Sequence, residues 1–353
     1  MKKKLNKNSL NGFINYGIIL VVYLVLQFLI GGGMVSNSLQ SLLVPACCYV
    51  VMAMSLNLTV GILGELSLGH AGFMSLGAFS GIVTSILLQS VLPAVPLRLA
   101  VSMAVGALAG GLGGVIVGVP VLRLRGDYLA IVTLAFGQII KNIIMVLYVG
   151  VDGTGLHVAL NSDRFILAED GTTIIKGPMG AVGVTKLASF TAGFVLILIT
   201  LLVVQNLVNS RAGRAIMALR DNRIAAESVG INVTKYKLMA FVISAALAGA
   251  AGALFGLNYS STVASKFDFN TSILVLVFVV LGGLGSIRGS MIAAALLYVL
   301  PELLRSFDIA EYRMLIYAII LILVMLATNN PTLKNFFGAV FKKKKKPASR
   351  TSK

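Results

Sequence analysis

Charged side chains are scarce in this chain. Asp, Glu, Lys and Arg make up 12% of its 353 residues, against about a quarter in soluble domains. An apolar helix needs about 20 residues to cross the hydrocarbon layer of a membrane, so each long uncharged interval can hold one span, and the first can hold two. A soluble globular domain is therefore excluded, and a polytopic membrane protein is expected. The intervals lie between Lys7 and Glu65, Glu65 and Arg98, Arg98 and Arg123, Lys186 and Arg211, Lys237 and Lys266, Asp268 and Arg288, and Arg313 and Lys334.

Cysteine, histidine and the common catalytic motifs are also nearly absent. Cys47 and Cys48 are adjacent in an apolar run. Neighbouring helical residues point apart, so we expect packing rather than a disulfide or a metal site. His70 and His157 each stand alone. The sequence has no GxxxxGKS or GxxxxGKT loop, no HExxH, no CxxC and no serine elbow. We therefore expect no enzymatic activity, no metal and no cofactor.

Positive charge is in excess, with 29 Lys and Arg against 12 Asp and Glu. Nucleic acid would be one partner for such a chain, but the basic clusters all fall on one side of the predicted spans. This distribution follows the positive-inside rule, so we assign that side, and both termini, to the cytoplasm and expect no nucleic acid. The tail 331–353 is expected to contact anionic lipid headgroups. The clusters are Lys2–Lys7, Arg123 and Arg125, the segment 209–237, and Lys342–Lys346.

The apolar runs predict an all-α bundle of about ten transmembrane helices in a single domain, 1–330. The first run follows basic residues, as a signal peptide would, but it is too long and lacks a clear cleavage site, so we interpret it as a retained span. Small residues in the fourth and seventh runs would let helix backbones approach closely. The predicted spans are 14–32, 42–63, 73–92, 97–119, 128–149, 187–208, 238–257, 271–281, 290–304 and 314–327.

Glycines interrupt two otherwise apolar stretches, 61–72 and 282–289. Transporters use broken membrane helices because unwound backbone and helix ends can contact a polar solute away from water. Tight helix packing or a cytoplasmic turn would give the same composition. The residues do not decide between these interpretations, and the fold class predicted here includes glycine-broken helices.

The longest strongly polar interval between two apolar runs is Asn209–Lys237. Its apolar residues recur at helical spacing, which predicts two short amphipathic helices separated at Asp221 and Asn222. Either residue can cap the second helix, and Gly230 can end it in the left-handed conformation. We interpret the segment as a cytoplasmic docking surface; the alternative is a solvated loop that only sets orientation. The other polar interval, 150–186, is expected to be an irregular extracytoplasmic lid with room for a short hairpin.

Ionisable side chains inside membrane spans are costly and often functional. Glu65 lies at the first glycine break, and Lys141 lies well inside the predicted span 128–149. Gln138 and Lys141 are three residues apart, so they share one helical face. We predict that Glu65 approaches this face, directly or through one water. The alternative is a solvated Glu65 at the cytoplasmic boundary that never meets the fifth span.

Four ordered motifs carry a family resemblance: GELSLGHAGFMSLGAF, RLRGDYLAIVTLAFGQII, GRAIMALRDNRIAAESVGINVTKYKLMAFVISAALAGAAGAL and GGLGSIRG. Together they resemble the permeases of high-affinity branched-chain amino acid ABC importers, with the LivM-type subunit nearer than the LivH-type. The resemblance implies a multi-pass protein of the bacterial inner membrane that moves leucine, isoleucine and valine by alternating access. It also implies a second, related permease, two cytoplasmic ATPase subunits and an extracytoplasmic solute-binding protein as partners.

The resemblance also implies which residues carry the function. The ABC-importer pattern EAA-x-x-x-G aligns with Ile224-Ala225-Ala226 and Gly230, with Ile224 in place of Glu. The residues expected to couple the permease to its ATPases are Arg214, Ala218, Arg220, Ala225, Ala226, Glu227 and Gly230. The residues expected along the translocation pathway are Glu65, Ser67, His70, Gln138 and Lys141.

Three departures from the family pattern keep alternatives open. The family usually has Gln where Glu65 stands and an acidic residue where Gln138 stands, and the segment DGTGLH after the fifth span differs from the common TGG pattern. Importers of urea, short amides and other amino acids share this scaffold, so they remain alternatives for the substrate. A self-sufficient ion-coupled transporter or channel is the alternative of another class, with Glu65, Lys141 and His70 as its relay.

Overall fold

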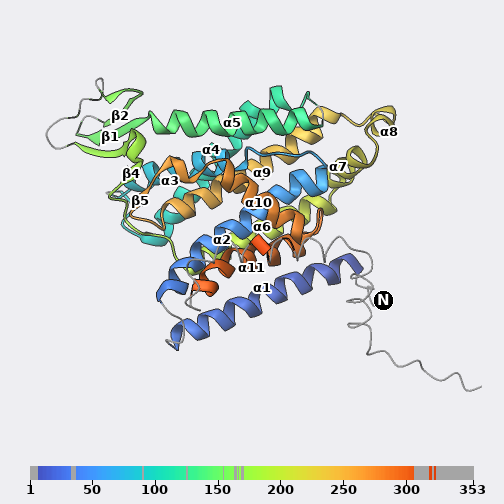
Figure 1. Cartoon of the computed structure of the whole chain (residues 1–353), viewed down its shortest axis with the longest axis horizontal. Helices are drawn as coiled ribbons and strands as arrows, with labels where there is room; N and C mark the ends of the chain where they lie inside the picture. Colours follow the sequence, from blue (N-terminus) through green and yellow to red (C-terminus); the bar gives the residue numbers. More distant parts are fainter. Residues whose placement is uncertain are drawn as a thin grey trace, which may run out of the picture. The chain divides into compact units, whose positions relative to one another are not determined.

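The computed structural model describes residues 7–32, 37–89, 91–124, 126–153, 155–162, 165, 167, 171–305, 318, 319 and 322. Contacts divide the chain into two compact units, Met1–Tyr298 and Val299–Lys353. Helices dominate the described residues (Figure 1). They are α1 (Lys7–Gly31), α2 (Asn37–Asn57), the π-helix η1 (Leu58–Leu63), α3 (His70–Leu87), α4 (Val95–Val121), α5 (Asp127–Met145), the 3₁₀ turn η3 (Gly177–Met179), α6 (Phe190–Asn209), α7 (Arg211–Asp221), α8 (Arg223–Ser228), α9 (Val233–Gly256), the 3₁₀ turn η4 (Ala264–Lys266), α10 (Phe269–Gly282) and α11 (Ile287–Arg305).

Seven of the described helices are long and apolar enough to cross a membrane. Ile19–Gly31 and Ile287–Pro301 are shorter apolar helices. The chain is therefore a helical membrane protein. The predicted span 314–327 lies outside the described residues except for 318, 319 and 322. The seven long spans are Leu39–Leu63, His70–Leu87, Val95–Val121, Tyr128–Met145, Phe190–Asn209, Val233–Gly256 and Ala264–Gly282.

Helices α3, α4 and α9 form the centre of the first unit and pack through glycine. A β-carbon added to Gly77 of α3 would lie 1.9 Å from the carbonyl oxygen of Gly249 in α9. One added to Gly249 would lie 2.2 Å from the carbonyl oxygen of Gly106 in α4. Only glycine permits such backbone contact, since overpacking a well-filled interior is costly. The close helix approach predicted from the small residues is confirmed.

A small sheet corrects the expectation of an all-α protein. Its strands are β1 (Tyr148–Asp152), β2 (Gly155–Ala159), β3 (Thr172–Lys176), β4 (Ala181–Val182) and β5 (Ser261–Thr262). The order is β2-β1-β3-β4-β5, and every pairing is antiparallel. The segment 150–186, expected to be an irregular lid, thus forms most of a sheet. Strand β5, from a distant part of the chain, completes one edge of it. In the first unit the sheet lies at the opposite end of the helices from α7 and α8 (Figure 1).

The backbone leaves the helical conformation in both glycine-rich stretches. The π-helix η1 extends α2 and ends at Gly64, which has φ of +81°. The chain is then non-helical until α3 begins at His70. In the second stretch, α10 ends at Gly282, and Gly283 and Gly285 have φ of +94° and +80° before α11 begins. These positive φ values require glycine, because a β-carbon would clash with the backbone.

The contact between Gly249 and Gly106 predicts a stability difference between two glycine-to-alanine variants. Gly249→Ala should lower the melting temperature of the detergent-purified protein, since its new methyl group meets a backbone carbonyl. Gly111→Ala of α4 should not, because its added β-carbon would find the Ala246 β-carbon at 3.4 Å, an ordinary contact. Cys47 and Cys48 are buried, so their reaction with a maleimide dye on heating reports unfolding. Equal melting temperatures for the two variants would contradict the packing argument.

Candidate functional site at the helix breaks

The polar segment between α6 and α9 folds into two short helices. Ser210 caps α7, because its hydroxyl accepts a hydrogen bond from the amide of Gly213 at 3.1 Å. Asn222 separates α7 from α8 and accepts from the amide of Ala225 at 3.0 Å, so it is the cap of the second helix. Gly230 follows the end of α8 with φ of +84°. The two predicted helices, the break and the left-handed glycine are confirmed.

Helix α7 is packed firmly on the membrane helices. Ile216 is fully buried in a cluster with residues of η1, α6 and α9. The turn from α6 into α7 is equally tight, since a β-carbon on Gly213 would lie 2.2 Å from the carbonyl oxygen of Leu207. Helix α7 is therefore fixed to the C-terminal end of the α2–η1 helix, not held away from it as a loop. The buried members of this cluster are Leu58, Ile62, Leu63, Val204, Ile216, Ala240 and Leu247.

The other side of the α7–α8 segment faces outward. Ile224 and Val229 are 80% and 74% exposed, which is unusual for large apolar side chains in a polar segment. Arg223 Nε donates to Glu227 Oε1 at 2.9 Å across one turn of α8. Of the predicted coupling residues, Arg214, Arg220, Ala225, Glu227 and Gly230 are exposed, Ala218 is half-buried and Ala226 is buried.

Arg220 differs from its neighbours because its side chain reaches the first helix break. Its Nη1 donates to the carbonyl oxygen of Gly61 in η1 at 3.1 Å. Its Nε and Nη2 donate to Asp221 Oδ1 at 3.1 and 3.0 Å. The aliphatic part of the side chain lies against Gly64, where an added β-carbon would be 2.6 Å from Arg220 Cγ. The sequence grouped Arg220 with the other coupling residues, and the structure sets it apart from them.

The two helix breaks meet directly at this point. A β-carbon on Gly61 would lie 2.1 Å from the amide nitrogen of Gly285. Asn57, at the end of α2, joins the same contact: its Oδ1 accepts from Gly285 N at 2.8 Å. Its Nδ2 donates to Ser290 Oγ of α11 at 3.2 Å. We call the group formed by Asn57, Gly61, Gly64, Gly285 and Ser290 the glycine junction.

Glu65 pairs with Lys237, not with the partners predicted from the sequence. The Nζ of Lys237, in α9, donates to Glu65 Oε1, and the side chains are 5% and 17% exposed. The sequence pointed instead to Gln138 and Lys141. Lys237 was placed at the edge of a solvated segment, so its burial was not foreseen. The segment 209–237 therefore contacts the first break at two points, through Arg220 and through Lys237.

Ser67 and His70, the other two pathway residues predicted in the first break, are buried. His70 Nε2 lies 2.8 Å from Ser55 Oγ, whose hydroxyl donates to the Met52 carbonyl oxygen. Ser67 Oγ is buried and has no hydrogen-bond partner among the described residues.

Helix α5 contacts the break through residues other than the predicted ones. Thr133 Oγ1 accepts from the Leu68 amide at 3.1 Å, and a β-carbon on Gly137 would lie 3.1 Å from Gly69 Cα. Gln138 and Lys141 are half-buried on the same helix. The structure thus brings Glu65, Ser67 and His70 together in one segment and places α5 beside it.

Three residues of this site were not predicted from the sequence: Asn57, Lys237 and Ser290. A lone amide in an apolar run was the signal for Asn57, because buried polar groups need partners. Lys237 and Ser290 gave no local signal, since their contacts lie 172 and 233 residues away in the chain.

Seven long apolar helices among the described residues, joined to a packed polar segment, define a multi-span helical membrane protein. The model for the permease component of branched-chain amino acid transport systems matches residues 38–325, and the chain belongs to this family. The resemblance to LivM-type permeases is confirmed.

Individual relatives agree with the family match. The high-affinity branched-chain amino acid transport system permease protein LivM of Salmonella typhimurium is 34% identical over 320 residues, which cover 87% of this chain and 72% of that protein. LivM of Escherichia coli K12 is 33% identical over 331 residues, covering 83% and 69%. LivH of Salmonella typhimurium is 36% identical over 117 residues, covering 33% and 38%. No solved structure gives a significant match.

The buried pair of Lys237 and Glu65 predicts a non-additive stability effect. Lys237→Met alone should cost about 3 kcal/mol, because it leaves a carboxylate buried without its partner. Adding Glu65→Gln should recover most of this loss, since both charges are then gone. The exposed pair of Arg223 and Glu227, 34% and 47% exposed, is the control and should contribute less than about 1 kcal/mol. Thermal unfolding of the single and double variants measures the coupling, and strictly additive losses at Glu65 and Lys237 would refute it.

Proposed function

We propose that this chain is a membrane subunit of an ATP-driven importer for branched-chain amino acids in the inner membrane of a bacterium. The observation that carries the proposal is the match to LivM proteins over most of the chain, because those proteins are named as permeases of high-affinity branched-chain amino acid transport systems. The subunit does no chemistry on the solute, and leucine, isoleucine and valine are its expected substrates.

The proposed topology has ten spans with both termini in the cytoplasm. The segment 209–237 then lies in the cytoplasm and 150–186 outside, within a membrane domain 1–330 followed by the basic tail 331–353. The excess of basic residues in 209–237 supports this orientation. The position of the sheet at the opposite end of the helices from α7 and α8 agrees with it (Figure 1).

The proposed partners are a second permease, two cytoplasmic ATPases and an extracytoplasmic solute-binding protein. Separately named permeases, LivM and LivH, occur in Escherichia coli K12, which supports a related second permease over a second copy of this chain. The ATPases would bind the exposed side of α7 and α8. Ile224 and Val229 supply its apolar contact, and the surrounding charges supply orientation.

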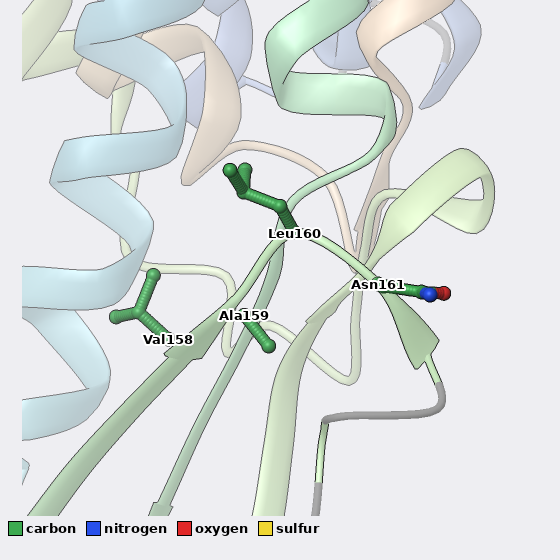
Figure 2. A pocket seen from close by; sticks show the side chains of 4 residues that line it. All are labelled: Val158, Ala159, Leu160 and Asn161. Atoms are coloured by element: carbon green, nitrogen blue, oxygen red, sulfur yellow. The ribbon is translucent and has the colours of Figure 1, made fainter.

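The proposed mechanism is alternating access. Solute released at the outer face enters between the two permeases, and closure of the ATPase pair moves α7 and α8. The polar residues of the first break and of α5 are the proposed lining of the path: Glu65, Ser67, His70, Gln138 and Lys141. A pocket at the end of β2, lined by Val158, Ala159, Leu160 and Asn161, contains none of these residues (Figure 2).

The energy source separates this proposal from an ion-coupled transporter. Proteoliposomes containing the two permeases and both ATPases should accumulate leucine when ATP and the loaded binding protein are supplied. Omitting the ATPases should abolish accumulation. Ribose is the specificity control, because a ribose import permease of Haemophilus influenzae is a more distant relative, 26% identical over 205 residues. Leucine accumulation driven by a proton or sodium gradient without ATPases would refute the proposal.

The exposed apolar residues predict where the ATPases bind. Ile224→Asp should lower recovery of the ATPases with the purified permeases, because it places a charge at the centre of an apolar contact. Leu160→Asp is the matched control: Leu160 is 65% exposed but lies beyond β2 at the sheet, so ATPase recovery should be unchanged. If Ile224→Asp retains the ATPases as fully as the wild type, α8 is not their contact.

A further inference from the structure

Arg220 connects the exposed α7–α8 segment to the membrane interior. The other described hydrogen bonds of basic side chains on these two helices stay within the segment or reach its border. Arg223 pairs with Glu227, and Arg214 Nη1 donates to the Asn209 carbonyl oxygen at 3.2 Å. The bond from Arg220 to Gly61, by contrast, joins residues 159 positions apart.

The carbonyl group that Arg220 holds is available because the helix ends there. In a continuing α-helix, the Gly61 oxygen would accept from the amide of Glu65. That amide donates instead to the Thr59 carbonyl oxygen at 3.0 Å. The last carbonyls of a helix need partners from elsewhere, and Arg220 supplies a charged donor, which makes a strong hydrogen bond.

The position of the guanidinium is set on both sides. Asp221 accepts from Nε and Nη2, which leaves Nη1 to donate to Gly61. Gly64 leaves room for the aliphatic part of the Arg220 side chain, because a β-carbon on Gly64 would collide with Arg220 Cγ. Arg220 therefore cannot be shifted without changing its contact with the break.

The same guanidinium lies beside the second break. A β-carbon on Gly285 would be 3.3 Å from the Gly61 oxygen and 3.8 Å from Arg220 Nη1. Arg220 is thus in place to act on the contact between η1 and the turn that precedes α11, two segments far apart in the sequence.

We propose that Arg220 is the positioning residue through which α7 controls the glycine junction, so that displacement of α7 separates or closes the inner ends of the two broken helices. This inference rests on the proposed function, since the displacement would come from the ATPases. In a purely structural role, Arg220 would only tie α7 to η1, and its loss would reduce stability without changing how hydrolysis is linked to transport.

The first test compares transport with hydrolysis in the complete importer, in proteoliposomes with both permeases, both ATPases and the binding protein. Arg220→Ala should leave ATP hydrolysis in place but lower the leucine transported per ATP by about tenfold, the effect of losing one hydrogen bond from a charged donor. Arg211→Ala removes the same charge from the exposed first residue of α7, which is outside the set of coupling residues, and its ratio should stay within about twofold of wild type.

A conservative variant covers the case in which Arg220→Ala fails to assemble. Arg220→Lys keeps the charge and most of the aliphatic stem, but one ammonium group cannot hold both Gly61 and Asp221 in the geometry of the guanidinium. The leucine transported per ATP should again fall. A wild-type ratio for Arg220→Lys, or an equal fall for Arg211→Ala, would overturn the proposal.

The second test follows the junction itself. Leu284 is 57% exposed in the turn next to Gly285, so Leu284→Cys provides a thiol there, while Cys47 and Cys48 are buried. Trapping the ATPases with ATP and vanadate should change the rate of maleimide labelling at this position. Adding Arg220→Ala should remove the change, and adding Arg211→Ala should preserve it. If labelling still responds to trapping in the Arg220→Ala background, another residue transmits the movement.

The results of these experiments distinguish the proposed function of the chain from the proposed role of Arg220. If the wild-type complex does not transport leucine with ATP, the proposed function is wrong. If it does, and the Arg220 variants match it in ratio and labelling, only the role of Arg220 is wrong.

Discussion

The structure depends on how the chain satisfies its backbone groups where the helices end at Gly64 and Gly282. Buried amides and carbonyls are costly without a hydrogen-bond partner, so each of these segments needs polar partners from other elements. Thr133 accepts from Leu68, and Ser272 accepts from Ala71 at 3.1 Å. Asn57 accepts from Gly285. The breaks are therefore specified by polar side chains on several helices as much as by their own glycines.

Close contact is the second requirement, and it explains much of the glycine content. At Gly61 and Gly285 the backbones of two breaks touch, and at Gly77 and Gly249 those of two helices do so. Without a hydrophobic driving force between helices in lipid, such packing is a main source of association. The same composition thus serves two purposes: some glycines allow turns with positive φ, and others remove side chains from a helix contact.

The sequence predicted correctly those elements that depend on interactions between residues close together in the chain. The spacing of Ile216 and Leu219 and the capping residue Asn222 defined α7 and α8, and the adjacent cysteines do lie buried as free thiols. The sheet was not predictable in the same way, because β4 and β5 have two residues each and lie about 80 positions apart. The partner of Glu65 was missed for the same reason: hydropathy marks Lys237 as the start of a span but does not say which carboxylate will face it.

Helices α6 and α9 are tied together at both ends. At one end α7 and α8 connect them; at the other, Val184 N donates to the Ser260 carbonyl oxygen and Leu187 N to that of Leu257, both at 3.1 Å, beside the pairing of β4 with β5. We expect the sheet end to be the pivot of any tilt of these two helices. A helix of about 20 residues is about 30 Å long, so a tilt of about 5° around that pivot would displace the α7 end by about 2–3 Å and the sheet end hardly at all. A rotation too small to disturb the sheet would still exceed the length over which a hydrogen bond survives.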